Sequence, residues 1–207
     1  MKTEHFTKDD FNRCADFHGH VCPGLSIGFR ASGAGLEWLN ARRAVDEEVV
    51  AIVENNACGT DAVQVLTGCT FGKGNLIYRD HGKQVFIFIG RKSGQGVRIA
   101  MKPGVIETNE RHRELTGKIR EEAATEEERK EFWAIHHQRS QEILEKPVEM
   151  LFTISPINTA LPPKAKIEPS LPCGQCGEPT MASRLDEKEG IRICRDCVNV
   201  TDIIEGG

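Results

Sequence analysis

The 207-residue sequence lacks several features that would place it in a large class of proteins at once. No stretch reaches the roughly 18 uncharged apolar residues that a membrane-spanning helix needs. The first ten residues, MKTEHFTKDD, contain no apolar run and do not form a secretory signal. No charge dominates either: the net charge of −4 argues against a general binder of nucleic acid or anionic membranes. We therefore expect a cytoplasmic protein without a membrane partner.

The sequence also lacks any internal repeat, any ferredoxin-like run of cysteines and any recognisable molybdopterin-binding motif. It nevertheless contains eight cysteines, and thiols stay reduced in the cytoplasm. This favours metal ligation or thiol chemistry over a disulfide framework.

The most specific motif lies near the C-terminus. Cys173-x-x-Cys176 and Cys194-x-x-Cys197 are separated by 17 residues, the spacing of a structural four-cysteine zinc site. A unit of about 35 residues has too little core to fold alone, so metal binding would supply the folding free energy. We predict a zinc ribbon or treble clef with a short helix over residues 198–204, and a rubredoxin-like iron site is the alternative. Seven acidic and four basic residues from position 173 onward disfavour nucleic-acid binding.

The rest of the sequence predicts an α+β fold with helices packed on a mainly antiparallel sheet. Helices are expected over residues 8–17, 23–39, 59–66 and 107–145, and strands over 49–53, 76–78, 85–89, 97–101 and 150–154. A hairpin around His81-Gly82 is expected to join the strands 76–78 and 85–89. Five prolines between 155 and 172 predict an extended linker. The domains are thus a core over 1–154, a linker over 155–172 and a zinc unit over 173–207.

Two glycine-rich breaks carry the candidate core site. In the first break His18, His20 and Cys22 alternate, so their side chains can point to one side of an extended loop. Cys22 and Cys58 each precede a helix start, where backbone N–H groups and the helix dipole favour a thiolate. Asp61, one turn into its helix, could be a ligand, orient a histidine or act as a base, or it could only cap the helix. We predict a catalytic or metal site of these five residues, with His18, Cys22 and Cys58 as ligands.

A third glycine-rich segment spans residues 68–74. It is one residue short of a phosphate-binding P-loop and lacks the Ser or Thr after Lys73. It could still bind an anion, so we assign Lys73 and Cys69 to cofactor binding, with a pocket-lining turn and a core cysteine as the alternatives. His112 is expected at the surface. His136 and His137 point to different faces of a charged helix and match no HExxH motif.

These motifs together resemble a known family. The segment FHGHVCPGLSIG (residues 17–28), Cys58-x-x-Asp61 and the 68–74 loop are similar to the FmdE family of formylmethanofuran dehydrogenase proteins over about residues 11–145. The C-terminal unit looks like the zinc domain of some members. The resemblance implies an α+β core that forms a homodimer, with His and Cys residues around a metal-binding active site. It also implies association with a molybdenum or tungsten enzyme, although many members occur as stand-alone proteins.

We therefore expect a metal-binding, redox-linked protein. Its C-terminal unit would hold structural zinc, and its core would hold a second ion, zinc or similar, with a position open to a small-molecule or cofactor ligand. Whether it is an enzyme is left open. The alternatives are a non-enzymatic metal or cofactor carrier or an adaptor for a molybdenum or tungsten enzyme, and, least favoured, a zinc-ribbon transcription regulator.

Overall fold

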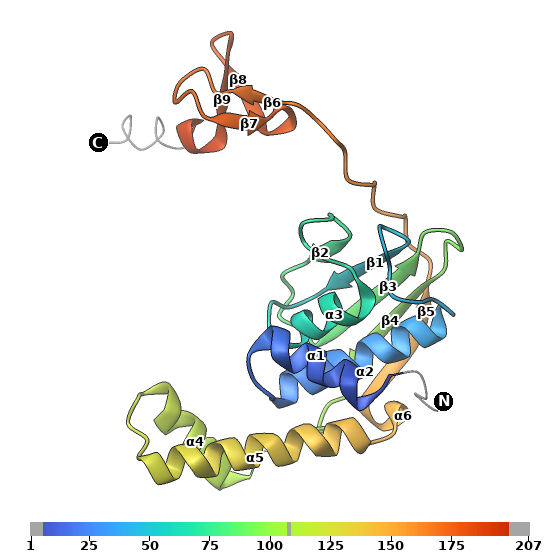
Figure 1. Ribbon diagram of the computed structural model, residues 1–207, viewed down its shortest axis with the longest axis vertical. Helices are drawn as coiled ribbons and strands as arrows, with labels where there is room; N and C mark the ends of the chain where they lie inside the picture. Colours follow the sequence, from blue (N-terminus) through green and yellow to red (C-terminus); the bar gives the residue numbers. More distant parts are fainter. Residues whose placement is uncertain (1–5, 107–108, 199–207) are drawn as a thin grey trace. The chain divides into compact units, whose positions relative to one another are not determined.

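The computed structural model describes residues 6–106 and 109–198 (Figure 1). The chain divides into two compact units, Met1–Lys164 and Ala165–Gly207. The boundary between them falls within the proline-rich segment over 155–172.

The N-terminal unit is built on one five-stranded sheet with the order β2-β1-β3-β4-β5. The strands are β1 (Val49–Val53), β2 (Leu76–Tyr78), β3 (Val85–Gly90), β4 (Gly96–Met101) and β5 (Phe152–Ile157). All neighbouring pairs are antiparallel except β1 and β2, which are parallel. The predicted α+β fold with a mainly antiparallel sheet is therefore confirmed.

The predicted hairpin between β2 and β3 is wrong. Strand β1 lies between them, pairing in parallel with β2 and in antiparallel with β3. The reason is the helix between β1 and β2: a strand that follows such a crossover returns parallel to the strand that preceded it. The segment around His81 closes the end of β1, where its N–H donates to the carbonyl of Glu54.

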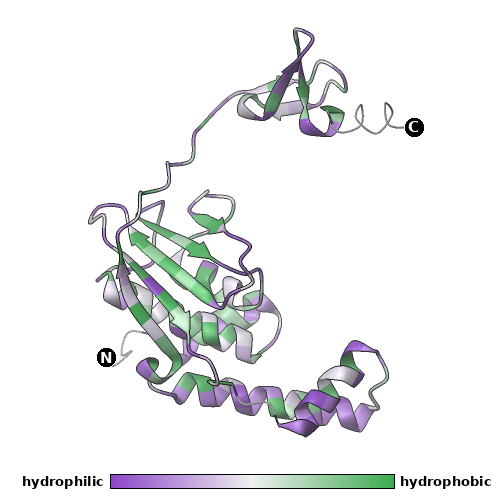
Figure 2. Cartoon of the chain, turned by 180° about the vertical axis from the view of Figure 1, so that it is seen from behind, coloured by the Kyte–Doolittle hydropathy of each residue, from purple (hydrophilic) through white to green (hydrophobic). Residues whose placement is uncertain are grey.

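Helices α1 (Lys8–His18), α2 (Pro23–Trp38) and α3 (Gly59–Thr67) cover one face of the sheet (Figure 1). A capping box of Thr7 and Asp10 opens α1, and Pro23 occupies the first turn of α2. The other face carries no described helix, and its strands are visible in Figure 2.

The long helix expected over 107–145 is two helices, and residues 107–108 lie outside the described part of the chain. Helix α4 (Glu110–Arg120) ends before Glu122, whose φ of 56° breaks the helix, and the Thr125/Glu128 capping box opens α5 (Glu126–Glu145). The strand expected from residue 150 begins at Phe152 instead. A short helix, α6 (Val148–Leu151), precedes it because Val148 and Leu151 are buried one turn apart.

Side chains on β1 and β3 are apolar on both faces of the sheet. Ala51 and Phe88 pack with the helices, whereas Val50, Ile52 and Ile87 form a second cluster on the opposite face. Two-sided burial explains why these strands read as continuous apolar runs rather than alternating ones.

The C-terminal unit holds two small hairpins, β6 (Ser170–Pro172) with β7 (Pro179–Met181) and β8 (Leu185–Lys188) with β9 (Ile191–Cys194). A 3₁₀ turn, Ala182–Arg184, connects them. Residues 195–198 are helical, so this helix begins three residues before the predicted start at residue 198, and residues 199–204 of that prediction lie outside the described residues.

Glycines bring α2 and α3 into backbone contact. A Cβ built on Gly28 would lie 2.1 Å from the carbonyl oxygen of Gly59. Both residues are buried in the described structure, so only the absence of a side chain lets the two helices approach this closely.

Substitution of Gly28 by alanine is expected to lower the free energy of unfolding by about 3 kcal/mol, because the new methyl group forces the helices apart. The matched control is Gly117→Ala in α4, where an added Cβ meets nothing within 4 Å. That variant should gain about 0.5–1 kcal/mol from helix propensity. Urea unfolding of both variants measures the difference, and equal stability of Gly28→Ala and the unmodified protein would contradict the close contact.

Candidate metal centres

The first centre lies where α1 ends and α2 begins. Gly19 ends α1 in the left-handed conformation, with φ 91°, so the chain reverses directly after His18. Cys22 is the N-cap of α2 and accepts a hydrogen bond from the N–H of Leu25, with the sulfur 3.4 Å away. His18 and Cys22 therefore face each other across the turn that joins α1 to α2.

Asp61 of α3 fixes the orientation of His18. Its Oδ2 lies 2.7 Å from Nδ1 of His18, and the opposite ring nitrogen, Nε2, lies 3.8 Å from the sulfur of Cys22. A carboxylate on Nδ1 holds the proton there and leaves the lone pair of Nε2 free for a metal. Tetrahedral zinc with one nitrogen and one sulfur ligand places the two atoms about 3.5 Å apart, so the observed distance suits shared coordination.

His20 completes a group of three convergent ligand atoms. One ligand atom each from His18, His20 and Cys22 lie within 4.8 Å of one another. The imidazole rings of His18 and His20 are 4.4 Å apart between centroids. Burial and the neighbouring His18 lower the pKa of His20, which keeps its imidazole in the neutral form that binds metal.

The two cysteines differ from the expectation for helix N-termini. Burial raises the pKa of Cys22 to about 11, outweighing the N–H of Leu25 and aided by the nearby Cys58 thiol. Cys58 makes no side-chain cap for α3. A Cβ on Gly24 would lie 3.6 Å from the Cys58 sulfur and 3.9 Å from that of Cys22, so the two thiols are neighbours. A cation at the site would favour the ionised form of Cys22.

The structure brings the five predicted core residues together. Asp61 contacts His18, and His18 lies close to Cys22. Cys58 is a neighbour of Cys22, and His20 lies beside His18. Cys58 stands beside Cys22 but outside the three-ligand group of the described residues. Asp61 contacts the group only through His18, consistent with an orienting role among the alternatives given for it.

Lys73 and Cys69 lie elsewhere. The ammonium group of Lys73 donates to the carbonyls of Val45 and Asp46, 3.4 and 2.9 Å away. Cys69 is fully buried, donates to the carbonyl of Val49 and has its pKa raised to about 11 by burial. Both residues therefore tie the 68–74 loop to the start of β1, and their assignment to cofactor binding stays a prediction.

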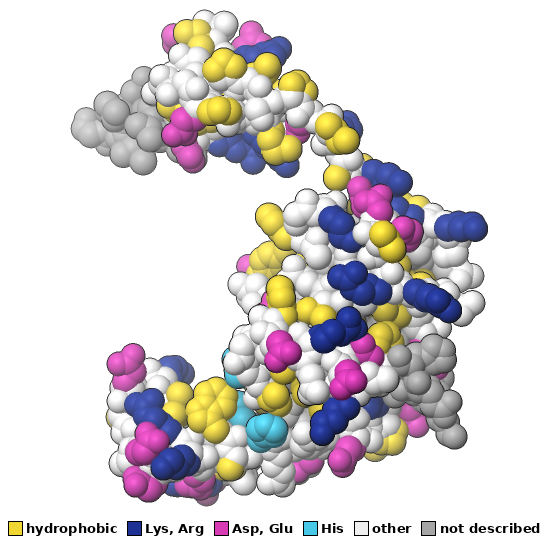
Figure 3. Space-filling view, in the orientation of Figure 1, with side chains coloured by type: hydrophobic (Ala, Val, Ile, Leu, Met, Phe, Trp, Pro, Cys, Tyr) yellow, Lys and Arg dark blue, Asp and Glu magenta, His cyan; other side chains and the backbone are white. Residues whose placement is uncertain are grey.

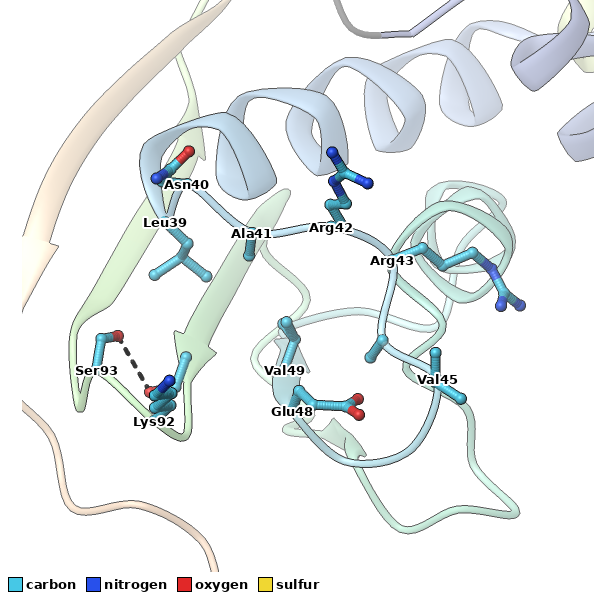
Figure 4. A pocket seen from close by; sticks show the side chains of 12 residues that line it. Leu39, Asn40, Ala41, Arg42, Arg43, Val45, Glu48, Val49, Lys92 and Ser93 are labelled. Atoms are coloured by element: carbon cyan, nitrogen blue, oxygen red, sulfur yellow. Dashed lines mark hydrogen bonds between the residues drawn. The ribbon is translucent and has the colours of Figure 1, made fainter.

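A cavity of about 590 Å³ adjoins that region, bounded by the 39–49 loop and the turn after β3 (Figure 4). Leu39 and Val49 line it, whereas the guanidinium groups of Arg42 and Arg43 point outward, and Arg43 donates to the carbonyl of Val65. None of its lining residues belongs to the His/Cys group.

Sequence reasoning missed the contribution of α5. Trp133 packs edge-on against His20 with centroids 5.5 Å apart, and the Ser140 hydroxyl donates to the carbonyl of Cys22. The prediction that His112 lies at the surface is wrong, because it is only 8 % exposed beneath this helix. Figure 3 shows histidine side chains gathered where the α4–α5 pair meets the rest of the unit. The helical spacing of Phe132, His136, Ser140 and Ile143 is the signal that could have revealed this face.

The second centre is the four-cysteine cluster of the C-terminal unit. The sulfurs of Cys173 and Cys197 are 3.8 Å apart, and those of Cys176 and Cys194 are 3.9 Å apart. Tetrahedral zinc with Zn–S bonds of about 2.3 Å separates its sulfurs by about 3.8 Å. The cluster could therefore bind a metal ion as it stands.

Backbone N–H groups and neighbouring thiols shift the pKa values of cysteines in this cluster in opposite directions. N–H groups of Cys176 and Cys194 lower the pKa of Cys173 to about 6. The Cys194 thiol and burial raise the pKa of Cys197 to about 12. The thiolate of Cys173 is thus favoured, whereas Cys176 and Cys197 have raised pKa values, and a divalent cation would favour the thiolate form of these two as well.

Metal removal by a chelator such as EDTA is expected to unfold the C-terminal unit, because its buried side chains are few and centre on Cys173, Ile193 and Cys197. Limited proteolysis followed by mass mapping should then show cuts within 170–198 that the zinc-loaded protein resists. The N-terminal unit should keep its thermal transition. Protection of residues 170–198 in the metal-free protein would contradict a metal-dependent fold.

The fold and these two centres define a class of protein: an α+β unit that gathers His and Cys side chains at a helix junction, followed by a four-cysteine unit. Residues 17–153 match the family described as FmdE, molybdenum formylmethanofuran dehydrogenase operon. The chain belongs to the FmdE family. Within the described residues, no helix is long and apolar enough to cross a membrane.

Proteins similar to this chain include a curated relative and a solved structure. A probable S-adenosyl-L-methionine-binding protein from Archaeoglobus fulgidus is 36 % identical over 196 residues, which cover 89 % of this chain and 51 % of the relative. The chain thus spans about half the length of that relative. The crystal structure of a tungsten formylmethanofuran dehydrogenase FmdE-like protein from Syntrophus aciditrophicus matches with a TM-score of 0.62 at 24 % identity, over 97 % of this chain and 96 % of that one. This second likeness shows a shared fold.

Proposed function

We propose that the N-terminal unit binds a divalent metal ion of the zinc type through His18, His20 and Cys22 and keeps one coordination position open to a ligand. The observation that carries this proposal is the orientation of His18, with Nδ1 held by Asp61 at 2.7 Å and Nε2 directed at the Cys22 sulfur. Three protein ligands and one exchangeable position are the pattern of catalytic zinc sites. Such an ion would supply a Lewis acid and an anchoring point for a ligand.

Cys58 gives this site a second thiol beside Cys22. Adjacent thiols next to a metal support a redox-linked role, because they can ligate the ion or react with what binds to it. The family description and the structural relative name molybdenum and tungsten formylmethanofuran dehydrogenases. We propose such an enzyme system as the setting in which the protein works, as a catalytic component or as a carrier or adaptor.

Cys22→Ala is expected to lower the metal content of the purified chain by about one ion, while the C-terminal ion remains. The matched control is Cys14→Ala, since Cys14 is a fully buried thiol of the neighbouring helix whose pKa burial raises to about 12. Elemental analysis of both variants and of the unmodified protein measures the difference. Equal metal content in Cys22→Ala and Cys14→Ala would refute a core metal.

Cys58→Ser then separates two roles of the second thiol. Loss of the same ion makes Cys58 a ligand. Retention of the ion leaves it as the thiol that faces whatever binds at the open position.

A second candidate function is binding of S-adenosyl-L-methionine, and the name of the Archaeoglobus fulgidus relative favours it. A cavity of about 720 Å³ beside Val21 offers a place of suitable size. Phe6, Phe11 and Phe29 line it, and Lys8 could face a carboxylate. Arg30 also lines it, but its guanidinium donates to the carbonyls of Leu144 and Lys146.

Calorimetric titration with S-adenosyl-L-methionine is expected to show one site per chain under this second candidate. Gln141→Trp should weaken the binding, because Gln141 is exposed on α5 and lines the cavity. Gln138→Trp, exposed on the same helix but outside the lining, is the control. Absence of heat would remove S-adenosyl-L-methionine binding as a candidate function. Equal affinity in both variants would remove this cavity as the binding site.

A further inference from the structure

Helix α5 forms a wall beside the His/Cys site. Ser140 anchors it to α2, since its hydroxyl is 2.5 Å from that of Ser26 and donates to the carbonyl of Cys22 across 3.4 Å. Two turns earlier, Trp133 contacts the ring of His20. His136 lies between these points and packs against Trp133 with centroids 5.8 Å apart. A single indole thus separates His136 from a candidate metal ligand.

His136 is the end of a buried string of hydrogen bonds. Nη1 of Arg139 lies 2.5 Å from Nδ1 of His112, and Nε2 of His112 lies 3.3 Å from Nδ1 of His136. Arg139 and His112 are 9 % and 8 % exposed. None of the interactions that join these three residues in the described structure involves a carboxylate.

The guanidinium of Arg139 determines which ring nitrogen carries the proton in His112 and in His136. A guanidinium group has only donors and does not deprotonate in proteins, so Nδ1 of His112 must accept. The one proton of neutral His112 therefore sits on Nε2 and is donated to Nδ1 of His136. Neutral His136 must then carry its own proton on Nε2.

The surroundings keep both imidazoles neutral. Burial first and then the charge of Arg139 lower the pKa of His112. Burial, followed by His112, Arg139 and His20, lowers the pKa of His136 and outweighs the backbone of Phe132, which acts in the opposite direction. Stacking on Phe132, with centroids 5.8 Å from His112 and 4.1 Å from His136, holds both rings in place.

We infer that Arg139 and His112 are positioning residues that hold His136 in one neutral tautomer, with its single N–H at Nε2, as a hydrogen-bond donor in the wall of the metal site. The inference rests on the proposed function and names the ligand class of its open position: a compound with an anionic oxygen, such as a small carboxylate. The metal binds the anion, and the fixed N–H of His136 meets the part of the ligand that extends past Trp133.

The tautomers are read directly by ¹⁵N–¹H correlation NMR of the histidine side chains in the full chain. We expect His112 and His136 both in the neutral Nε2–H form at pH 7. Arg139→Lys keeps a cationic donor and should preserve these tautomers, whereas Arg139→Met removes the donor and should release His112 and His136 into mixed tautomers. A protonated or Nδ1–H form of His136 in the unmodified protein would overturn the inferred hydrogen bonds from Arg139 through His112 to His136.

The ligand role is tested on the cobalt-loaded full chain with succinate as the probe, because its second carboxylate can extend past Trp133 when the first binds the metal. Binding is followed in the visible spectrum of the core cobalt ion. His136→Phe should weaken succinate binding about tenfold while cobalt stays bound, the loss expected for one hydrogen bond to a charged group. Gln138→Phe is the control, because Gln138 is exposed on the same helix and lies outside the lining of the cavity beside Val21. Arg139→Met should weaken succinate binding as well, and Arg139→Lys should restore it.

The outcomes separate the two proposals. Failure of the N-terminal unit to bind cobalt overturns the proposed function and with it the ligand role of His136. Cobalt binding with equal succinate affinity in His136→Phe and Gln138→Phe overturns the donor role alone.

Discussion

The contact between Gly28 and Gly59 is the constraint on which the core site depends. It lets the backbones of α2 and α3 touch, so that the beginnings of both helices meet although about 35 residues separate them in the chain. Cys22 and Cys58 become neighbours for that reason, and Asp61 reaches His18 at the end of α1. A larger residue at either glycine would separate the carboxylate from the imidazole that it orients.

The two groups of candidate ligands come together by different routes. In the C-terminal unit, four cysteines in two short motifs dominate a very small core, and the metal would organise the fold. In the N-terminal unit, the packing of three helices on a sheet already places the ligands, and a carboxylate from a third element sets the ring orientation. A preorganised site of this kind can leave a position open, whereas a structural site uses all four.

Local sequence patterns predicted the elements well and the long-range relations less well. The capping box at Thr7, the strand over 49–53 and the four-cysteine spacing are encoded within a few residues, and the structure contains each of them. The parallel pairing of β2 depends on the crossover through α3, which no local pattern around His81 shows. The proximity of His18, Cys22 and Asp61 was inferred from shared placement at helix ends, but their distances follow from helix packing.

The wrong prediction for His112 shows the same limit. The sequence of α5 is dense in charge, which hides the face that carries Trp133, His136 and Ser140. Burial of His112 requires α4 to fold back on α5, and the break at Glu122 that permits this is a backbone conformation without a strong sequence signal. Composition alone could therefore not distinguish a solvated helix from the wall of a site.

Arg91, directly after β3, gives the proline-rich segment a structural role. Its guanidinium donates to the carbonyls of Pro162 and Pro163 and pairs with Glu47 at 3.0 Å, with both charged side chains largely buried. Residues without regular secondary structure thus supply two acceptors to a largely buried cation at the end of β3. Removing the four-cysteine unit by a cut at Ser155, where the prolines begin, would also delete part of β5 and leave that cation short of two acceptors. The N-terminal unit is complete only when it retains the chain through Pro163.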